Sequence, residues 1–266
     1  MISLEVNQIC FSYLNGDVLH NVSLFVRAGE MVGLLGPNGS GKTTLIKLSS
    51  GVLKPDRGEI GYDGISLKRL KRKSIARQVA VVPQQFNIPF AFTAREVVTL
   101  GRTPFIKPFD EDSEIDRQYV SSALEQVGIN GLAERRFDEL SGGERQKVIL
   151  AMALSQQPKM LLLDEPILHL DITHQVEILE LVRGLNREQK ITVIAAMHDL
   201  NLAALYFDRL VLLKEGVVHA DGTPTQVLTE DAIRNIYGAS VRVEKHPTTG
   251  SPHIVIIPKD NTNHSQ

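Results

Sequence analysis

The sequence predicts an α/β fold with a mixed, mostly parallel sheet. Three observations predict it: short apolar runs recur along the chain, helical patterns lie between several of them, and a glycine-rich loop joins the first run to a helix. The apolar runs lie at residues 31–35, 79–82, 160–163, 191–197 and 209–213. Such runs are typical of strands buried on both faces, and strands that alternate with helices indicate a parallel sheet covered by helices.

An antiparallel β region is predicted ahead of the first buried run. Residues 3–13 alternate apolar and polar side chains, as a half-buried strand does. Asn15-Gly16 is a strong tight-turn signal, and residues 18–26 resume the strand-like pattern. The single cysteine, Cys10, lies in the first of these strands, and we interpret it as a packed strand residue rather than a reactive thiol.

A helical subdomain is predicted as an insertion at about 90–157, between two strands of the core. Thr93 and Glu96 have the spacing of a capping box, which marks a helix start. Residues 113–127 form a long amphipathic segment. No buried strand pattern interrupts this region, so we expect it to be mainly helical.

A C-terminal extension, 223–258, is predicted to follow a core domain at 1–222. Its sequence indicates two short helices and then a hairpin in which 241–244 pairs with 253–257. The last residues, 259–266, are polar and are expected to be disordered.

The composition is that of an ordinary soluble protein, with 42% hydrophobic and 23% charged residues. A net charge of −2 gives no global electrostatic argument for nucleic-acid binding. No run approaches the ~18 consecutive apolar residues that a membrane span needs, and no secretory signal is visible at the N-terminus. We therefore expect a cytosolic protein that reaches a membrane only through a partner. The basic run at 68–73 is interpreted as a solvated helix face, with a phosphate or lipid site as the alternative.

A P-loop pattern follows the first buried run and predicts a nucleoside triphosphate site. Glycines let backbone N–H groups approach the phosphates closely, and the loop leads into a helix whose N-terminus carries partial positive charge. Lys42 is expected to reach the β- and γ-phosphates, and the Thr43 hydroxyl is expected to bind Mg²⁺. The alternative is a glycine-rich turn with a chance lysine. The predicted nucleotide contacts are Gly36, Pro37, Asn38, Gly39, Ser40, Gly41, Lys42, Thr43 and Thr44.

Two adjacent carboxylates, Asp164 and Glu165, end the apolar run at 160–163. Neighbouring residues of a strand point to opposite sides, so we expect the two to have different roles. Asp164 is placed to hold the hydration shell of Mg²⁺, and Glu165 is placed to orient or deprotonate an attacking water. The alternative is a solvated junction between strand and loop.

The segment Leu140-Ser141-Gly142-Gly143-Glu144 indicates a second phosphate-binding element. A capping box would explain Ser141 and Glu144 but not two glycines in a first helical turn, where each costs about 1 kcal/mol against alanine. Bare glycines at a helix N-terminus make sense if an anion approaches the backbone. Two copies that face each other head to tail could then hold one γ-phosphate from both sides.

The order of these motifs resembles the nucleotide-binding subunit of ABC transporters, over roughly residues 3–222. The resemblance implies a P-loop NTPase fold with a RecA-like core, ATP hydrolysis, and ATP and Mg²⁺ as ligands. Between Glu165-Pro166 and Leu170-Asp171 the family usually has small hydroxyl residues, and this sequence has Ile167-Leu168. That departure affects the loop that crosses the dimer interface.

The resemblance also implies roles for single residues. Tyr13 would stack on adenine, and Gln84 would link Mg²⁺ and the attacking water to the helical subdomain, with Gln85 as the alternative. Ser141, Gly142 and Gly143 would contact the ATP held by the opposite subunit. Asp171 would lie on the loop that crosses the dimer interface, and His198 would act as the switch histidine that senses the γ-phosphate.

Residues 92–104 resemble the ATPases of importers for ferric siderophores, haem and vitamin B12, as do segments 198–201 and 246–250. The implied partners are a second copy of the chain, two membrane-spanning permease subunits and, indirectly, a substrate-binding protein, with no nucleic acid. The implied location is the cytoplasmic face of the inner membrane. Phe86, Ile88, Phe90 and Phe92 would then contact the membrane subunit, unless they pack locally. The alternatives are an ABC motor for another cargo or for export, a soluble ABC ATPase, and a simple P-loop kinase or GTPase.

Overall fold

The structure is a computed structural model that describes residues 1–14, 16–88, 90–106 and 113–258. The tail that we expected to be disordered, 259–266, lies outside these residues. Within the described part of the chain, no helix is long and apolar enough to cross a bilayer.

A six-stranded sheet forms the core, in the order β10-β9-β3-β8-β7-β6. The strands from β9 to β6 are parallel to one another, and only β10 is antiparallel to its neighbour. Every residue of β3, β7 and β8 is buried, as the continuous apolar runs predicted. The mixed, mostly parallel sheet is therefore confirmed. The strands are β3 (Met31–Leu35), β6 (Val79–Val82), β7 (Met160–Asp164), β8 (Thr192–Ala196), β9 (Arg209–Lys214) and β10 (Val217–Gly222).

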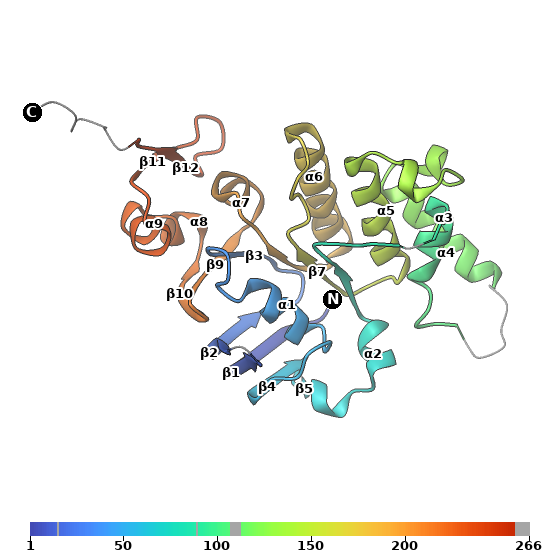
Figure 1. The fold of residues 1–266 in the computed structure, drawn as a ribbon, viewed down its shortest axis with the longest axis horizontal. Helices are drawn as coiled ribbons and strands as arrows, with labels where there is room; N and C mark the ends of the chain where they lie inside the picture. Colours follow the sequence, from blue (N-terminus) through green and yellow to red (C-terminus); the bar gives the residue numbers. More distant parts are fainter. Residues whose placement is uncertain (15, 89, 107–112, 259–266) are drawn as a thin grey trace, which may run out of the picture.

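A second sheet, β2-β1-β4-β5, is antiparallel and contains the N-terminal strands (Figure 1). It comprises β1 (Leu4–Tyr13), β2 (Gly16–Val26), β4 (Arg57–Tyr62) and β5 (Ile65–Ser66). The basic run follows it as a 3-10 turn, Leu67–Arg69, and the short helix α2 (Arg72–Ala76). All five of its basic side chains are exposed, which fits the solvated interpretation.

Helices cover the central sheet and form a separate group beside it. The helices α1 (Lys42–Ser49), α6 (Ile172–Gln189) and α7 (Leu200–Tyr206) follow strands of the core. The helices α3 (Ala94–Leu100), α4 (Glu114–Gln126) and α5 (Gly142–Ser155) pack on one another at the right of Figure 1. The predicted capping box at Thr93 and Glu96 is present at the start of α3.

The buried Arg102 connects these three helices. Its guanidinium donates to Asp116 Oδ1 on α4 and to the Ser155 carbonyl at the end of α5, both at 2.7 Å, and lies over the ring of Tyr119. A buried cation with several partners of this kind fixes the relative orientation of the elements that supply them.

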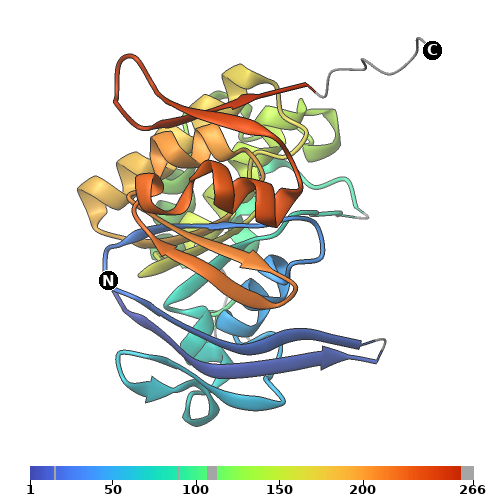
Figure 2. The ribbon, with the colours of Figure 1, turned by 90° about the vertical axis from the view of Figure 1, so that its left-hand side faces the viewer.

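The C-terminal extension lies against the β9–β10 side of the core (Figure 2). It consists of α8 (Pro224–Val227), α9 (Glu230–Tyr237) and a hairpin of β11 (Val241–Lys245) with β12 (Pro252–Ile256). The predicted hairpin is thus present, within a residue or two of the expected bounds. Asn201 on α7 exchanges hydrogen bonds with Ile254, so the hairpin is tied to the core.

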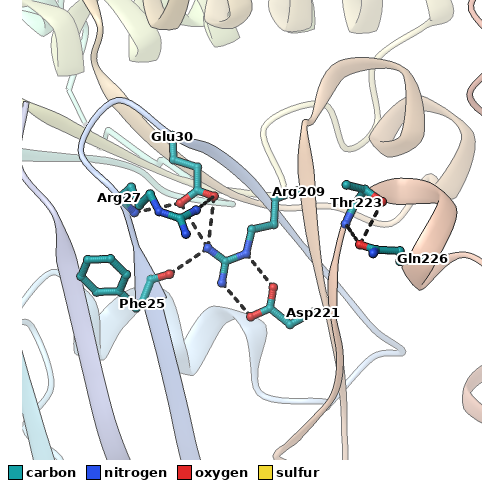
Figure 3. A network of polar contacts seen from close by, with 7 residues as sticks. All are labelled: Phe25, Arg27, Glu30, Arg209, Asp221, Thr223 and Gln226. Atoms are coloured by element: carbon teal, nitrogen blue, oxygen red, sulfur yellow. Dashed lines mark hydrogen bonds and ion pairs between the residues drawn. The ribbon is translucent and has the colours of Figure 1, made fainter.

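Arg209, at the start of β9, joins the neighbouring strand β10 to residues 25–30, which are distant in sequence (Figure 3). It makes a bidentate pair with Asp221 of β10 at 2.6 and 2.7 Å. It also donates to Glu30 ahead of β3 at 3.1 Å and to the Phe25 carbonyl of β2 at 2.8 Å. Hydrogen bonding to Asp221 raises the pKa of Arg209 further above its ordinary value. This cation therefore holds the antiparallel sheet to the edge of the core sheet.

Replacing Arg209 with Met should lower the free energy of unfolding by about 2–3 kcal/mol, because Glu30 and Asp221 would lose a shared cation in a partly buried site. Urea denaturation measures the change. The matched control is Arg117→Met, which breaks an exposed ion pair with Glu114. The side chains of Arg117 and Glu114 are 64% and 69% exposed. That variant should stay within about 0.5 kcal/mol of the wild type. Equal losses in both variants would show that Arg209 does not join the sheets.

Candidate functional site

The P-loop begins where β3 ends and wraps into the first turn of α1. Gly36 has φ +150°, and a Cβ there would lie 2.1 Å from the carbonyl oxygen of Leu213. Gly41, at φ +102°, is the N-cap of α1, where a Cβ would lie 2.5 Å from Leu19 Cδ2. Glycine is required at both positions by backbone conformation and by space. The alternative, a glycine-rich turn with a chance lysine, does not explain why both positions require glycine.

Lys42 lies inside the loop and is almost fully buried, with 4% of its surface exposed. Its ammonium donates to the carbonyls of Gly36 at 2.7 Å and Pro37 at 3.2 Å. Burial lowers the pKa of Lys42 below its ordinary value, against the opposing effect of the Glu165 and Asp164 carboxylates. The loop therefore holds one cation in the space that a phosphate chain would enter.

Thr43 and Asp164 bring a hydroxyl and a carboxylate together. The Thr43 hydroxyl, at the start of α1, donates to Asp164 Oδ1 at the end of β7 over 2.8 Å. Burial raises the pKa of Asp164 above its ordinary value, while the hydrogen bond from Thr43 lowers it in part. Hydroxyl and carboxylate oxygens are the ligands that Mg²⁺ prefers, so this donor set fits the predicted ion.

Glu165 is the meeting point of three segments. Gln84, which follows β6, donates to its Oε2 at 2.6 Å, and Nε2 of His198, which follows β8, contacts its Oε1. The strand β7 ends at Asp164, and Glu165 has the left-handed φ of +55°. We expected Asp164 and Glu165 to point to opposite sides as neighbours in a strand, but Glu165 lies outside the strand. A left-handed backbone turns Glu165 away from Asp164. Of the two candidate glutamines, Gln84 is the one that contacts Glu165.

A cleft of about 380 Å³ brings most of the predicted residues together. Tyr13 lies at its edge, 43% exposed and with its ring edge to face against Phe11 at 4.8 Å. An exposed aromatic beside a phosphate loop can stack on a base. The cleft is lined by Tyr13, Val18, Asn38, Gly39, Ser40, Gly41, Lys42, Thr43, Thr44, Gln84 and Glu165.

The segment from Ser141 to Gly143 lies outside the lining of this cleft. Ser141 is the N-cap of α5, and both hydrogen bonds of the capping box with Glu144 are present. Ser141 is itself exposed, which leaves this helix start open to a ligand from outside the chain. The capping explanation thus holds for Ser141 and Glu144, and the two glycines need another reason.

His174 supplies part of that reason, and sequence reasoning missed it. A Cβ on Gly143 would lie 2.1 Å from His174 Cδ2, so the ring packs directly on the glycine. His174 Nδ1 lies 2.8 Å from Asp171 Oδ1, and Asp171 is the N-cap of α6. The hydrogen bond from the backbone N–H of His174 lowers the pKa of Asp171. The only sequence signal was a histidine three residues after a helix cap, which does not reveal contact with α5.

Comparison with known proteins agrees with this geometry. A sequence profile described as "ABC transporter" matches residues 19–168, more than half of the chain. The chain belongs to the ABC transporter family.

Three relatives show how much of other ABC proteins this chain covers. It is 40% identical to YvrA of Bacillus subtilis, an uncharacterized ABC transporter ATP-binding protein, over 94% of this chain and 57% of that protein. It is also 40% identical to the cobalamin import ATP-binding protein BtuD of Halobacterium salinarum, over 97% of this chain and 64% of BtuD. The chain thus spans less than two thirds of these two relatives. The petrobactin import ATP-binding protein FpuC of Bacillus anthracis is 39% identical, with 90% of this chain and 88% of FpuC covered.

Two solved structures have the same fold. One is described as a metal-chelate type ABC transporter in an inward-facing conformation, with a TM-score of 0.85 and 27% identity over 98% of this chain and 99% of that chain. The other is a dimeric, post-hydrolysis state of the ATP-binding cassette MJ0796 bound to ADP and Pi, with a TM-score of 0.73 and 31% identity. The alignment covers 83% of this chain and 98% of MJ0796. The P-loop NTPase fold with its antiparallel β region is confirmed.

The departure from the usual ABC sequence, Ile167-Leu168, lies beside Glu165. Ile167 is buried and joins the core, whereas Leu168 is 36% exposed. Packing into the core therefore explains the apolar side chain of Ile167, but it covers Leu168 only in part.

Gly142 and Gly143, in the first turn of α5, offer a matched test of the His174 contact. Gly143→Ala should lower the free energy of unfolding by about 1–3 kcal/mol, because the new methyl group meets a ring that Asp171 holds in place. In Gly142→Ala the methyl group would meet only Leu170 Cδ2 at 3.7 Å. That variant should gain up to about 1 kcal/mol from the higher helix propensity of alanine. Thermal denaturation without nucleotide measures the stability of both variants. A Gly143→Ala protein as stable as the wild type would contradict the contact.

Proposed function

We propose that the chain is the ATP-binding and ATP-hydrolysing subunit of an ABC importer. The observation that carries the proposal is that Lys42, Thr43 and Glu165 line one cleft, and that Thr43 donates a hydrogen bond to Asp164. These groups come from α1, β7 and the turn after β7, so they meet only in the folded chain. Their chemistry is that of a triphosphate site with a base beside it.

Glu165 is the proposed base for hydrolysis. It would accept a proton from a water whose oxygen forms a bond to the γ-phosphorus while the bond to the bridging oxygen breaks. Gln84 and His198 hold its carboxylate from two sides, which fixes the direction in which it accepts the proton. Thr43, Gln84 and Asp164 would hold Mg²⁺, which supplies charge neutralisation at the phosphates when bound.

A second copy of the chain is the proposed source of the missing half of the site. Ser141 and Gly142, at the N-terminus of α5, are exposed and lie outside the lining of the chain's own cleft, so they are placed to meet a nucleotide that another copy holds. MJ0796, which shares the fold, is dimeric in a post-hydrolysis state. Two ATP molecules between two head-to-tail copies would close the dimer, and loss of the γ-phosphate would reopen it.

The cargo that we propose is an iron-siderophore, haem or cobalamin-type nutrient. Relatives of similar length carry the names of petrobactin, iron(3+)-hydroxamate and hemin import proteins, and BtuD that of cobalamin import. The import path itself would lie in two separate permease subunits, fed by a substrate-binding protein, at the cytoplasmic face of the membrane.

The aromatic segment after Gln84 is the proposed contact with the permease. Phe86, Ile88 and Phe92 are partly buried against the core, which local packing explains. Phe90 is 69% exposed and its ring lies edge to face against Phe92, so most of this side chain is available to a partner. Motion of Gln84 on ATP binding would reach the permease through this segment.

Replacing Glu165 with Gln should lower ATP turnover by at least about 100-fold, because the amide cannot accept the proton. ATP binding should persist, so the variant should accumulate as an ATP-loaded dimer. A phosphate-release assay and size-exclusion chromatography with ATP measure the two effects.

The matched control is Glu188→Gln, which makes the same change at an exposed position of α6 and should hydrolyse ATP at the wild-type rate. Wild-type turnover in Glu165→Gln would remove Glu165 as the base. A variant that stays monomeric at saturating ATP would argue against the shared site.

A further inference from the structure

A cavity of about 390 Å³ lies between the end of α1, the strand β4 and the segment that carries the basic run (Figure 1). It shares no lining residue with the nucleotide cleft, and neither the P-loop nor the segment 141–143 borders it. Its volume lies within the usual range of small-molecule sites, about 300–1,000 Å³. The cavity is therefore large enough to hold a ligand of its own.

The deepest walls of this cavity are apolar and belong to the folded core. Leu48 of α1, Ile60 of β4 and Ile75 of α2 line it and are buried in one hydrophobic cluster, which also contains the inner face of the antiparallel sheet. The Tyr62 hydroxyl of β4 donates to the Ser49 carbonyl at the end of α1, which holds two of these elements together. The walls are thus set by the fold and not by loose surface side chains.

Three leucines on connecting segments leave apolar surface open to the cavity. Leu53, Leu67 and Leu70 pack against the same cluster but are only partly buried. Leu53 follows α1, and the other two lie between β5 and α2. A ligand with an apolar body would cover this surface and gain free energy from its removal from water.

Three cations also line the cavity, namely Lys54, Lys68 and Arg72. All three residues are exposed, and none forms an ion pair with a residue that the structure describes. Among the described residues that line the cavity, none is acidic. Like charges around one cavity repel one another, and an anion among them would offset that repulsion. The cavity is therefore complementary in charge to an anion.

We propose that this cavity binds a small amphipathic anion of the fatty-acid type, with one apolar chain and a carboxylate at its end. The chain would lie on the leucines and isoleucines of the walls, and the carboxylate would lie among Lys54, Lys68 and Arg72. A volume of about 390 Å³ suits a ligand with one chain better than a two-chain lipid. The inference does not depend on the proposed ATP site, since the two cavities are lined by different residues.

The test is isothermal titration calorimetry of the full chain with decanoate. One decanoate should bind per chain, and octanoate should bind about tenfold more weakly because it buries two methylene groups fewer. Decyltrimethylammonium has the same apolar chain with the opposite charge and should not bind. Absence of decanoate binding would overturn the proposal. Equal affinity for octanoate and decanoate would also overturn it, since the apolar walls would then contribute nothing.

A triple variant tests the three cations of the lining. It should bind decanoate at least about tenfold more weakly, because each exposed charge contributes a modest attraction and the three act together. Its melting temperature should stay equal or rise, since like charges are removed from the surface, so a loss of binding would not reflect unfolding. The substitutions are Lys54→Gln, Lys68→Gln and Arg72→Gln.

A matched triple variant makes the same change in net charge beside the cavity. It combines Arg57→Gln, Arg69→Gln and Lys71→Gln, all at exposed positions outside the lining. This control should keep the wild-type affinity for decanoate. Equal weakening in the two triple variants would show an unspecific attraction between the basic surface and the anion, and the proposal would fail.

Two further measurements separate this site from other places for an anion. Lys42→Ala should bind decanoate with wild-type affinity, and a loss of binding would place the anion in the P-loop and overturn the proposal. Vesicles of phosphatidylcholine with phosphatidylglycerol test a membrane surface as the other occupant. If the chain sediments with these vesicles through the three lining cations but does not bind decanoate, a lipid surface replaces the free anion as the ligand.

Discussion

The hydrogen bond between Thr43 and Asp164 is the constraint on which the rest of the site depends. It joins the first turn of α1 to the end of β7 across 121 positions of sequence separation. Because β3, β8 and β7 are parallel neighbours, their carboxyl ends meet at one edge, and the loops that follow them carry Lys42, His198 and Glu165. The order of strands thus decides which of these side chains can come together. A chain with the same motifs on another strand order would not bring these side chains together.

The residues whose chemistry is fixed by backbone spacing could be predicted from the sequence. Gly36, Lys42 and Thr43 form one continuous loop, and a loop of that pattern between a buried strand and a helix has few other uses. Asp164 was predictable because two carboxylates end an apolar run in a chain that also contains a P-loop pattern. The bounds of the hairpin at 241–245 and 252–256 were also near the expectation, since alternation and a Pro-Thr-Thr-Gly turn mark it.

The contacts that depend on distant packing could not be predicted. Nothing near Gly143 in the sequence indicates that His174 lies on it, because this pair forms only when separate elements dock. The backbone of Glu165 was also missed. A strand that continues through both carboxylates would point them to opposite faces. The strand instead ends at Asp164, and Glu165 has a left-handed backbone. Short-range periodicity carries no information on such a turn.

The left-handed backbone of Glu165 has a consequence for how this position can vary. Valine, isoleucine and threonine adopt that conformation at high cost, whereas glycine, asparagine and aspartate adopt it readily. A homologue that does not need a base at position 165 could therefore have glycine, asparagine or aspartate there with the same backbone. A β-branched residue at this position in a natural homologue would indicate that the turn itself has been rebuilt. The backbone conformation of one residue thus limits which side chains this position can accept without rebuilding the turn.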